Sequence, residues 1–201
     1  MILISTKQVP ISEQHTHAHS LLSRALKEFG INYVPDETQV IRGEHGKPSL
    51  SEHPEVRYNI SHADGIAAVV VSEFECGIDC ERIRAYRPSV LKRCFCEEER
   101  SAVEAAPECE QNLMFFRLWT LKEAYVKALG RGLSFPLREA AFAFEGDDIL
   151  TELSEWAFKQ YIIGNEFIVS VCKIRNELSI KHESNMIYHL HAAEDISVYF
   201  R

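Results

Sequence analysis

A carboxylate and an ammonium are spaced four residues apart in the segment from Leu118 to Leu133, LWTLKEAYVKALGRGL. Apolar residues recur there at helical spacing from about Met114 to Leu129, and glycines follow, so we predict a helix that ends at the first of these glycines. Trp119, Glu123 and Lys127 then share one face of that helix. On its own, such a pair is typical of an ordinary exposed helix face, where it contributes about 0.2 to 0.5 kcal/mol.

Two further carboxylates alternate in the stretch GIDCERI, where Asp79 and Glu81 are separated by one residue. In an extended strand this spacing puts both side chains on one face, close enough to share a divalent cation. Acidic residues are disfavoured in strands, so the pair needs a reason, and a solvent-exposed edge strand is the alternative to a metal site. With Glu123 added, the three carboxylates are a candidate metal site between the strand and the helix.

The composition of the 201-residue chain, 46% hydrophobic and 26% charged, suits one large domain or two small ones. The segment MILISTKQVP lacks the pattern of an export signal, and no apolar run is long enough to span a bilayer, so we expect a cytoplasmic protein without a membrane partner. The six cysteines show no CxxC pairing, and we expect reduced thiols without disulfide or zinc. A net charge of −8 argues against a nucleic-acid partner.

Charge is distributed unevenly along the chain. Five basic residues and no acidic ones lie between Arg82 and Arg93, and three glutamates follow at Glu97 to Glu99. A local basic patch on an acidic protein favours a small acidic partner, although a solvated face of mixed charge explains the segment equally well.

Hydrophobic periodicity and turn residues predict the other elements. Ser61 to Gly65 form the expected bend of a hairpin, and three histidines at positions 15, 17 and 19 are interpreted as an exposed helix start. The tail from Tyr188 to Phe200 has a mixed pattern that predicts no element. We predict helices over His17 to Phe29 and Ser89 to Ala106, the second with Glu97 to Glu99 inside it or at a break and closed by Pro107. Strands are predicted over Ile2 to Ile4, Val56 to Ile60, Ile66 to Val71, Ala141 to Phe144, Ala157 to Ile163 and Phe167 to Cys172.

An ordered series of motifs resembles the 4′-phosphopantetheinyl transferases of the Sfp-like, monomeric type. It covers roughly positions 42 to 137, and the stretch HSLLSRAL also resembles the first helix of that family. The resemblance implies an α+β fold of two similar α/β halves, residues 1–74 and 75–201, which form an intramolecular pseudo-dimer with the active site between them. The motifs are GKP at Gly46 to Pro48, YNISH at Tyr58 to His62, GIDCE at Gly77 to Glu81, RCFCEEE at Arg93 to Glu99, and WTLKEAYVKALGRGL at Trp119 to Leu133.

Members of this family transfer the 4′-phosphopantetheine arm of coenzyme A to a serine of an apo acyl or peptidyl carrier protein and release 3′,5′-adenosine bisphosphate. The resemblance therefore implies coenzyme A and a carrier protein of fatty acid, polyketide or nonribosomal peptide biosynthesis as partners of a monomer. When a hydroxyl attacks a pyrophosphate, a divalent cation and lysines must neutralise charge on the phosphate oxygens, and a base must take the serine proton. The carboxylates and the lysine described above fit these roles.

The resemblance also implies residue roles. Asp79, Glu81 and Glu123 match the Mg²⁺ ligands, Glu123 matches the general base, and Lys127 matches the lysine that steadies the pyrophosphate. Only Lys7 is basic ahead of Arg24, whereas relatives carry several basic residues there, so Arg24 is the candidate for the 3′-phosphate. The implied coenzyme A contacts are Lys47, Pro48, Ser61, His62, Lys122, Lys127 and Arg24.

Two other functions fit the same residues. A magnesium-dependent phosphohydrolase would use Asp79, Glu81 and Glu123 but would not need the basic segment as a docking patch. A non-enzymatic carrier-protein-binding module would leave the carboxylates merely solvated, and magnesium-dependent binding of coenzyme A would exclude it.

Overall fold

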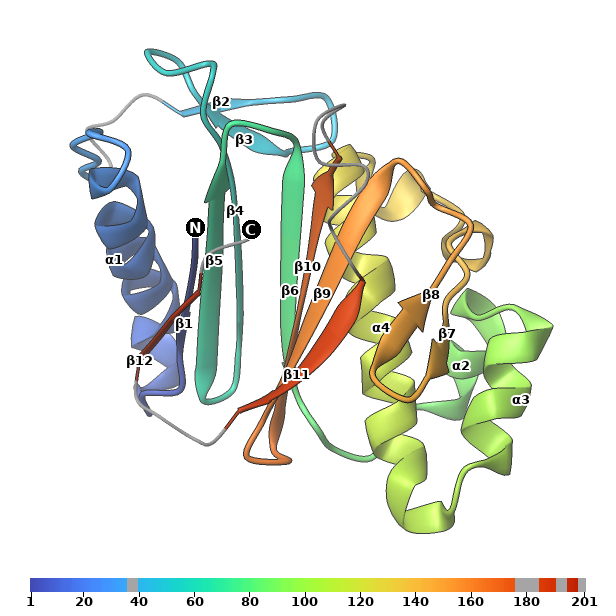
Figure 1. Cartoon of the computed structure of the whole chain (residues 1–201). Coiled ribbons are helices and arrows are strands. Elements are labelled where there is room, and N and C mark those ends of the chain that lie inside the picture. Colours follow the sequence, from blue (N-terminus) through green and yellow to red (C-terminus); the bar gives the residue numbers. More distant parts are fainter. Residues whose placement is uncertain (36–39, 176–184, 191–194, 199–201) are drawn as a thin grey trace.

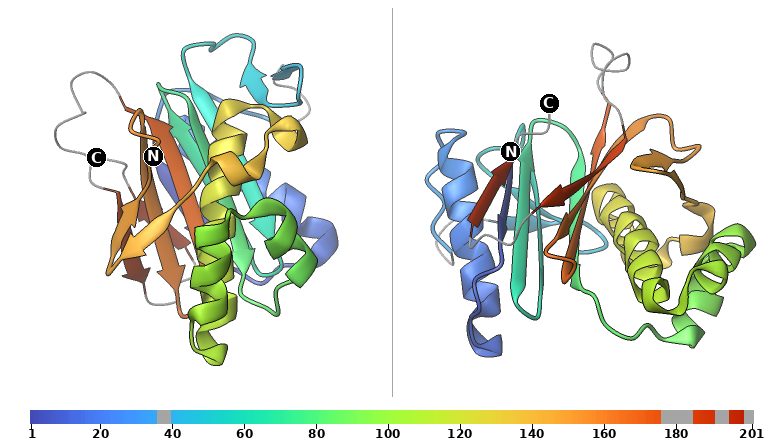
Figure 2. Two further views of the ribbon diagram at one scale, coloured as in Figure 1. Left: turned by 90° about the vertical axis from the view of Figure 1, so that its right-hand side faces the viewer. Right: turned by 60° about the horizontal axis from the view of Figure 1, so that its bottom comes forward.

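Two large β-sheets pack against each other, and each is covered on its outer side by one helix (Figures 1 and 2). The computed structural model describes residues 1–35, 40–175, 185–190 and 195–198. The predicted mixture of helices and strands is confirmed as a mixed α/β fold. Among the described residues, no helix combines the length and the apolar character that crossing a bilayer requires.

The first sheet has four antiparallel strands in the order β12-β1-β5-β4, covered by helix α1 (Gln14–Lys27). The predicted hairpin of β4 and β5 is confirmed, but it turns only at Asp64 and Gly65, where Gly65 has φ +78°. Ser61 and His62, which were predicted in the bend, lie inside β4. The short helix η1 (Ile11–Glu13) precedes α1. The strands are β1 (Ile2–Ser5), β4 (Arg57–Ala63), β5 (Ile66–Ser72) and β12 (Asp195–Val198).

The second sheet has six strands in the order β6-β10-β9-β11-β8-β7, and its outer face is covered by the long helix α4 (Glu108–Leu129). The tail that the sequence left unassigned supplies β11 here and β12 in the first sheet, while residues 191–194 and 199–201 lie outside the described part of the chain. The strands are β6 (Cys76–Arg82), β7 (Ala143–Glu145), β8 (Asp148–Leu150), β9 (Trp156–Ile163), β10 (Phe167–Ile174) and β11 (Met186–Leu190).

The helical segment before α4 is broken just ahead of Glu97, so of the two alternatives for Glu97 to Glu99 the break is confirmed. Phe95 and Cys96 are extended, and Glu99 closes a capping box with Cys96 at the start of the second helix. Pro107, expected to end the earlier helix, is the N-cap of α4, which therefore begins before the predicted Met114. The remaining elements are α2 (Pro88–Cys94), α3 (Glu97–Ala105), η2 (Gly132–Ser134), η3 (Leu137–Glu139), and the hairpin of β2 (Val40–Arg42) and β3 (Pro48–Leu50).

Strand β5 explains why the sheets form layers. It is a continuous apolar run, and alternate residues point to opposite faces of the sheet. Val69 and Val71 pack in the core beneath α1, whereas Ile66, Ala68 and Val70 join Ile78 and other residues of the second sheet. Both faces of the strand are thereby removed from water.

Helix α4 lies very close to β6 because one residue of that strand has no side chain. A Cβ added to Gly77 would lie 2.1 Å from the carbonyl oxygen of Ala124 and 2.5 Å from the amide nitrogen of Ala128. The helix ends at Gly130, which adopts a left-handed conformation with φ +64°, as glycine does most readily. These two glycines fix both the approach and the end of the helix that carries Glu123 and Lys127.

Strands β4 and β6 lie next to each other at the junction of the two sheets (Figure 1). Side chains of β4 bridge the two strands. The Ile78 amide donates to Asn59 Oδ1 at 3.0 Å, and the Cys80 amide donates to Ser61 Oγ at 3.2 Å. The boundary between residues 74 and 75 falls just before β6 and stays a prediction, since β12 pairs with β1 in the first sheet.

Candidate active site

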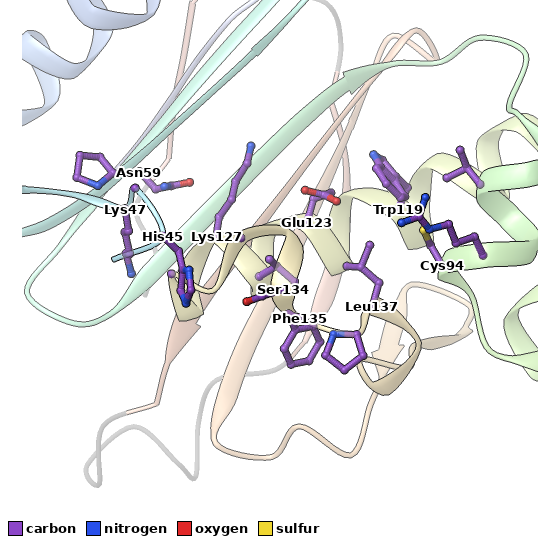
Figure 3. Close-up of a pocket in the computed structure, with 18 of the residues that line it drawn as sticks. His45, Lys47, Asn59, Cys94, Trp119, Glu123, Lys127, Ser134, Phe135 and Leu137 are labelled. Atoms are coloured by element: carbon purple, nitrogen blue, oxygen red, sulfur yellow. The ribbon is translucent and has the colours of Figure 1, made fainter. Parts of the chain in front are cut away.

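A cavity of ≈ 830 Å³ lies against the polar face of α4 (Figure 3). Trp119, Glu123 and Lys127 line it together, so the face predicted from their four-residue spacing is confirmed. Lys47 and Pro48 also line it, with Lys47 against the end of α4, and the segment from Gly130 to Leu137 forms a further wall.

Three polar side chains meet beside this cavity, across the junction of β4, β6 and α4. Lys127 Nζ donates to Asp79 Oδ1 at 2.7 Å and to Ser61 Oγ at 3.0 Å, and the Ser61 hydroxyl donates to the same Asp79 oxygen at 3.0 Å. Asp79 and Ser61 are buried, whereas Lys127 keeps 29% of its side chain exposed. The sequence motifs that contain these three residues therefore meet in space.

The carboxylates around Lys127 influence one another. Burial, together with the negative charges of Asp79 and Glu81, raises the pKa of Glu123 to about 7, while the positive charge of Lys127 opposes the shift. Burial also raises the pKa of Glu81, against a hydrogen bond from Arg84 at 2.8 Å. For Lys127, burial lowers the pKa, but the Asp79 carboxylate outweighs burial and the net shift is upward.

The donor set suits a hard cation. Asp79 Oδ2 is buried and has no hydrogen-bond partner, although a buried carboxylate oxygen normally has one. A divalent cation between Asp79, Glu81 and Glu123 would relieve their mutual repulsion. As the described residues stand, no group of three or more histidine, cysteine or acidic side chains is gathered tightly enough to hold a metal, and the Lys127 ammonium neutralises Asp79 instead.

A second cavity, of ≈ 660 Å³, adjoins the first and shares Pro48 and Asn59 with it. His15, His19 and Arg42 line this cavity with His62. The ring centroids of His15 and His19 are 4.4 Å apart, and those of His15 and His62 are 6.3 Å apart. Burial lowers the pKa of His62, and the nearby charges of His15 and Lys127 add to the shift.

These cavity-lining residues correct part of the sequence interpretation. His15 and His19 lie four residues apart on one face of α1, and that spacing was the signal that could have identified them as more than an exposed helix start. Arg24, the residue predicted to hold the 3′-phosphate, is exposed on α1 and lines neither cavity.

Lys122 does not reach the cavity, so its predicted contact with coenzyme A has no support in the geometry. Its side chain is 0% exposed, and its ammonium is held by Glu99 at 2.7 Å. Successive residues of an α-helix point about 100° apart, so Lys122 points away from the face that carries Glu123. Lys47, in contrast, lines the cavity while donating to Glu75 and, at 2.5 Å, to the carbonyl of Ala128.

Comparison with known proteins shows what this arrangement is similar to. Residues 75–172 match the model of the 4′-phosphopantetheinyl transferase superfamily. The chain is 34% identical over 105 residues to 4′-phosphopantetheinyl transferase gsp of Aneurinibacillus migulanus, which covers 52% of this chain and 44% of that protein. It is 31% identical over 134 residues to 4′-phosphopantetheinyl transferase Sfp of Bacillus subtilis (strain 168), covering 64% of this chain and 60% of that protein.

A third relative, 4′-phosphopantetheinyl transferase AcpT of Escherichia coli O157:H7, is 35% identical over 113 residues, covering 55% of this chain and 56% of AcpT. The chain thus spans less than two thirds of the length of these three relatives. The matched residues contain Asp79, Glu81, Glu123 and Lys127, and the resemblance inferred from the ordered motifs is confirmed. Residues 75–172, just under half of the chain, are therefore similar to the 4′-phosphopantetheinyl transferase superfamily.

Proposed function

We propose that this protein transfers the 4′-phosphopantetheine moiety of coenzyme A to a serine of an apo acyl or peptidyl carrier protein. One observation supports this most strongly: Glu123 and Lys127 line one cavity, and Lys127 joins Asp79 to Ser61 at its edge. A base with a pKa of about 7 beside a lysine fits proton abstraction from a hydroxyl that attacks a phosphate.

In the proposed reaction, the pyrophosphate of coenzyme A lies along α4 between Lys127 and Lys47. Glu123 takes the proton of the carrier serine, whose oxygen forms a bond to the phosphorus that carries the pantetheine arm. The bond from this phosphorus to the bridging oxygen breaks, and 3′,5′-adenosine bisphosphate leaves with that oxygen. Lys127 offsets the negative charge that gathers on the leaving group.

Asp79, Glu81 and Glu123 are the residues proposed to hold Mg²⁺. The ion, when bound, would neutralise charge on the phosphate oxygens. The orphaned Asp79 Oδ2 supports this assignment, and Lys127 and Arg84 are the cations that now occupy parts of the acidic site. We expect the Lys127 ammonium to turn from Asp79 towards the substrate phosphate when the metal is present.

We further propose that the two sheets are the halves of an intramolecular pseudo-dimer, divided near residue 74. A strand hairpin covered by a helix occurs in each half: β4 and β5 beneath α1, and β9 and β10 beneath α4. Because the acidic residues and lysines lie at the junction of these halves, a single chain would supply a whole site, as expected of a monomer.

The test is incubation with an apo carrier protein, coenzyme A and Mg²⁺, followed by mass spectrometry of the carrier. The expected product carries one phosphopantetheine on its serine, with release of 3′,5′-adenosine bisphosphate. Cleavage of coenzyme A without carrier modification would instead establish the phosphohydrolase. Carrier binding without any cleavage of coenzyme A would establish the non-enzymatic binding module.

The raised pKa of Glu123 predicts how the reaction depends on pH. The deprotonated carboxylate is needed both as base and as ligand, so kcat should rise with pH through about 7 when Mg²⁺ is limiting. Metal binding favours the charged form, so the midpoint of the pH profile should move to lower pH as the Mg²⁺ concentration rises. A profile independent of Mg²⁺ concentration would contradict the shared role.

The Glu123 carboxyl affects the stability of the fold in the opposite direction to kcat, because its contribution to stability falls as pH rises. Its pKa is higher in the folded chain than in the unfolded one, so the contribution is complete below the ordinary value of 4.5 and is lost as pH rises through about 7. We therefore expect Glu123→Gln to raise the melting temperature at pH 8 more than at pH 5, in metal-free buffer. An equal change at both pH values would show that the carboxyl titrates normally.

Lys127→Ala and His62→Ala are expected to raise KM for coenzyme A. Each substitution removes a donor to a charged phosphate, and such a hydrogen bond contributes about 1.5 to 3 kcal/mol, which is about a 10- to 150-fold change. Steady-state kinetics measure the change, with Lys27→Ala, an exposed lysine outside both cavities, as the control. Unchanged kinetics in both variants would rule out this part of the site, and Lys127→Ala should also lower kcat.

A further inference from the structure

The buried ammonium of Lys122 donates all of its hydrogen bonds to groups inside the protein. Besides Glu99 at 2.7 Å, it donates to the carbonyl oxygens of Leu137 at 2.9 Å and Ala140 at 2.6 Å. A lysine ammonium has three protons, and these three acceptors use all of them. The side chains of Lys122 and Glu99 are 0% and 1% exposed, so water cannot replace a lost partner.

Glu99 extends this contact to two more segments. Its Oε1 accepts a hydrogen bond from the Phe142 amide, and its Oε2 accepts one from the Cys96 amide, each at 3.0 Å. One buried ion pair thus joins α4, the start of α3 and the backbone between residues 137 and 142. This backbone belongs to the chain segment that follows α4.

That segment forms a wall of the cavity. It leaves α4 at Gly130, runs back beside the helix and contributes Ser134, Phe135 and Leu137 to the lining (Figure 3). Leu137 faces the cavity with its side chain and is held from behind through its carbonyl by Lys122. Arg138 holds the outer side of the same segment by donating to the carbonyls of α2 residues Lys92 and Arg93, at 2.6 and 3.0 Å.

We propose that Lys122 and Glu99 are positioning residues that hold the 130–142 wall of the cavity against α4, and that Lys122 acts on coenzyme A through this wall rather than by contact with a phosphate. The proposal rests on the proposed function for its substrate but not for its structural part. The proposal predicts that substitution of Glu99, which lines neither cavity, raises KM for coenzyme A as much as substitution of Lys122 does.

The variants that test this are Glu99→Gln, Lys122→Met and the double variant. Breaking a buried ion pair from one side leaves an uncompensated group, so either single variant can lose stability, whereas removing both charges together is often tolerated. The double variant therefore keeps the test valid if a single variant fails to fold. The matched control is Glu97→Gln with Arg100→Met, an ion pair on the same helix, α3, in which the Glu97 side chain is 72% and the Arg100 side chain 28% exposed.

The first measurement is steady-state kinetics with varied coenzyme A. We expect Glu99→Gln and Lys122→Met each to raise KM for coenzyme A about tenfold, with a smaller effect on kcat, and the double variant to be no worse than the more affected single variant, since the residues act as one unit. If Lys122 touched phosphate directly, Glu99→Gln would leave this KM unchanged, and that result would overturn the proposal.

The second measurement needs neither coenzyme A nor a carrier. Hydrogen exchange followed by mass spectrometry should show faster exchange across residues 132–142 in all three variants and native exchange in the control. Native exchange in the folded double variant would overturn the proposal. Failure of the native protein to transfer phosphopantetheine would instead remove the proposed function, and the exchange result would still decide whether the ion pair holds the wall.

Discussion

Replacing Glu123 with alanine is expected to abolish phosphopantetheine transfer and leave the protein folded. A positioned general base contributes about 10²- to 10⁴-fold to a rate, and the proposed metal loses a charged ligand in the same substitution. Because both roles are lost, no Mg²⁺ concentration should restore activity. The measurement is the initial rate of carrier modification over a series of Mg²⁺ concentrations, with circular dichroism as the check of folding.

Asp79→Ala is the matched comparison, because it removes a carboxylate that is a proposed ligand but not the base. Its activity should fall as far at low Mg²⁺ and recover in part at high Mg²⁺. The substitution also leaves Lys127 without its partner on β6, so part of the loss should persist. If added Mg²⁺ recovers no activity in folded Asp79→Ala, metal binding is not the main role of Asp79; if it rescues Glu123→Ala, Glu123 is not the base.

The parts of the site that the sequence predicted are those set by local periodicity. Trp119, Glu123 and Lys127 recur every four residues, and a helix brings such residues to one face regardless of what packs against it. Their shared face is confirmed, since all three line the same cavity. The link between Asp79 and Lys127 was predicted only through the resemblance of the ordered motifs to a family. Nothing within the stretch GIDCE specifies which helix lies beside that strand.

The errors arise where a distant partner decides the outcome. Lys122 is adjacent to Glu123 in the chain, and only the position of Glu99 shows that its ammonium points into the protein. Ser61 and His62 were placed in a turn because polar residues surround them, but the left-handed conformation at Gly65 moves the turn past them. The break before Glu97, which the sequence left as one of two alternatives, is fixed at Cys96 because Glu99 caps helix α3 there.

Not all of the basic residues from Arg82 to Arg93 contribute to a basic surface. Arg82 is paired with Asp64 and Glu166, and Arg84 with Glu81, so these two guanidinium groups are neutralised locally. Arg87 and Lys92 are exposed on and beside α2, and Arg93 lines the mouth of the cavity. Arg138, which the sequence analysis did not single out, lies against the backbone of Lys92 and Arg93. The basic surface of α2 thus consists of Arg87, Lys92, Arg93 and Arg138.

This surface predicts where an acidic carrier protein docks. With a net charge of −8, the protein should repel an acidic partner except where basic residues gather, and the basic surface of α2 adjoins the cavity that contains Glu123. Complementary charge mainly accelerates association and selects partners, and salt screens it over about 8 Å at physiological ionic strength. Charge reversal at Arg87 and Lys92, which line neither cavity, should therefore weaken carrier docking without touching the coenzyme A site.

Reversal of Arg87 and Lys92 to glutamate is expected to raise KM for the carrier about tenfold at low salt, a fold-change within the range by which steering accelerates association. KM for coenzyme A should stay the same, and most of the salt dependence of the reaction should disappear. The matched control reverses Lys7 and Lys27, two exposed lysines outside both cavities, which changes the net charge equally. Equal carrier KM values for the variant and the native protein at low salt would place docking elsewhere, with the partly buried Leu113 and Met114 as the next surface to test. An equal rise in the control would mean that net charge, rather than the basic surface of α2, governs carrier association.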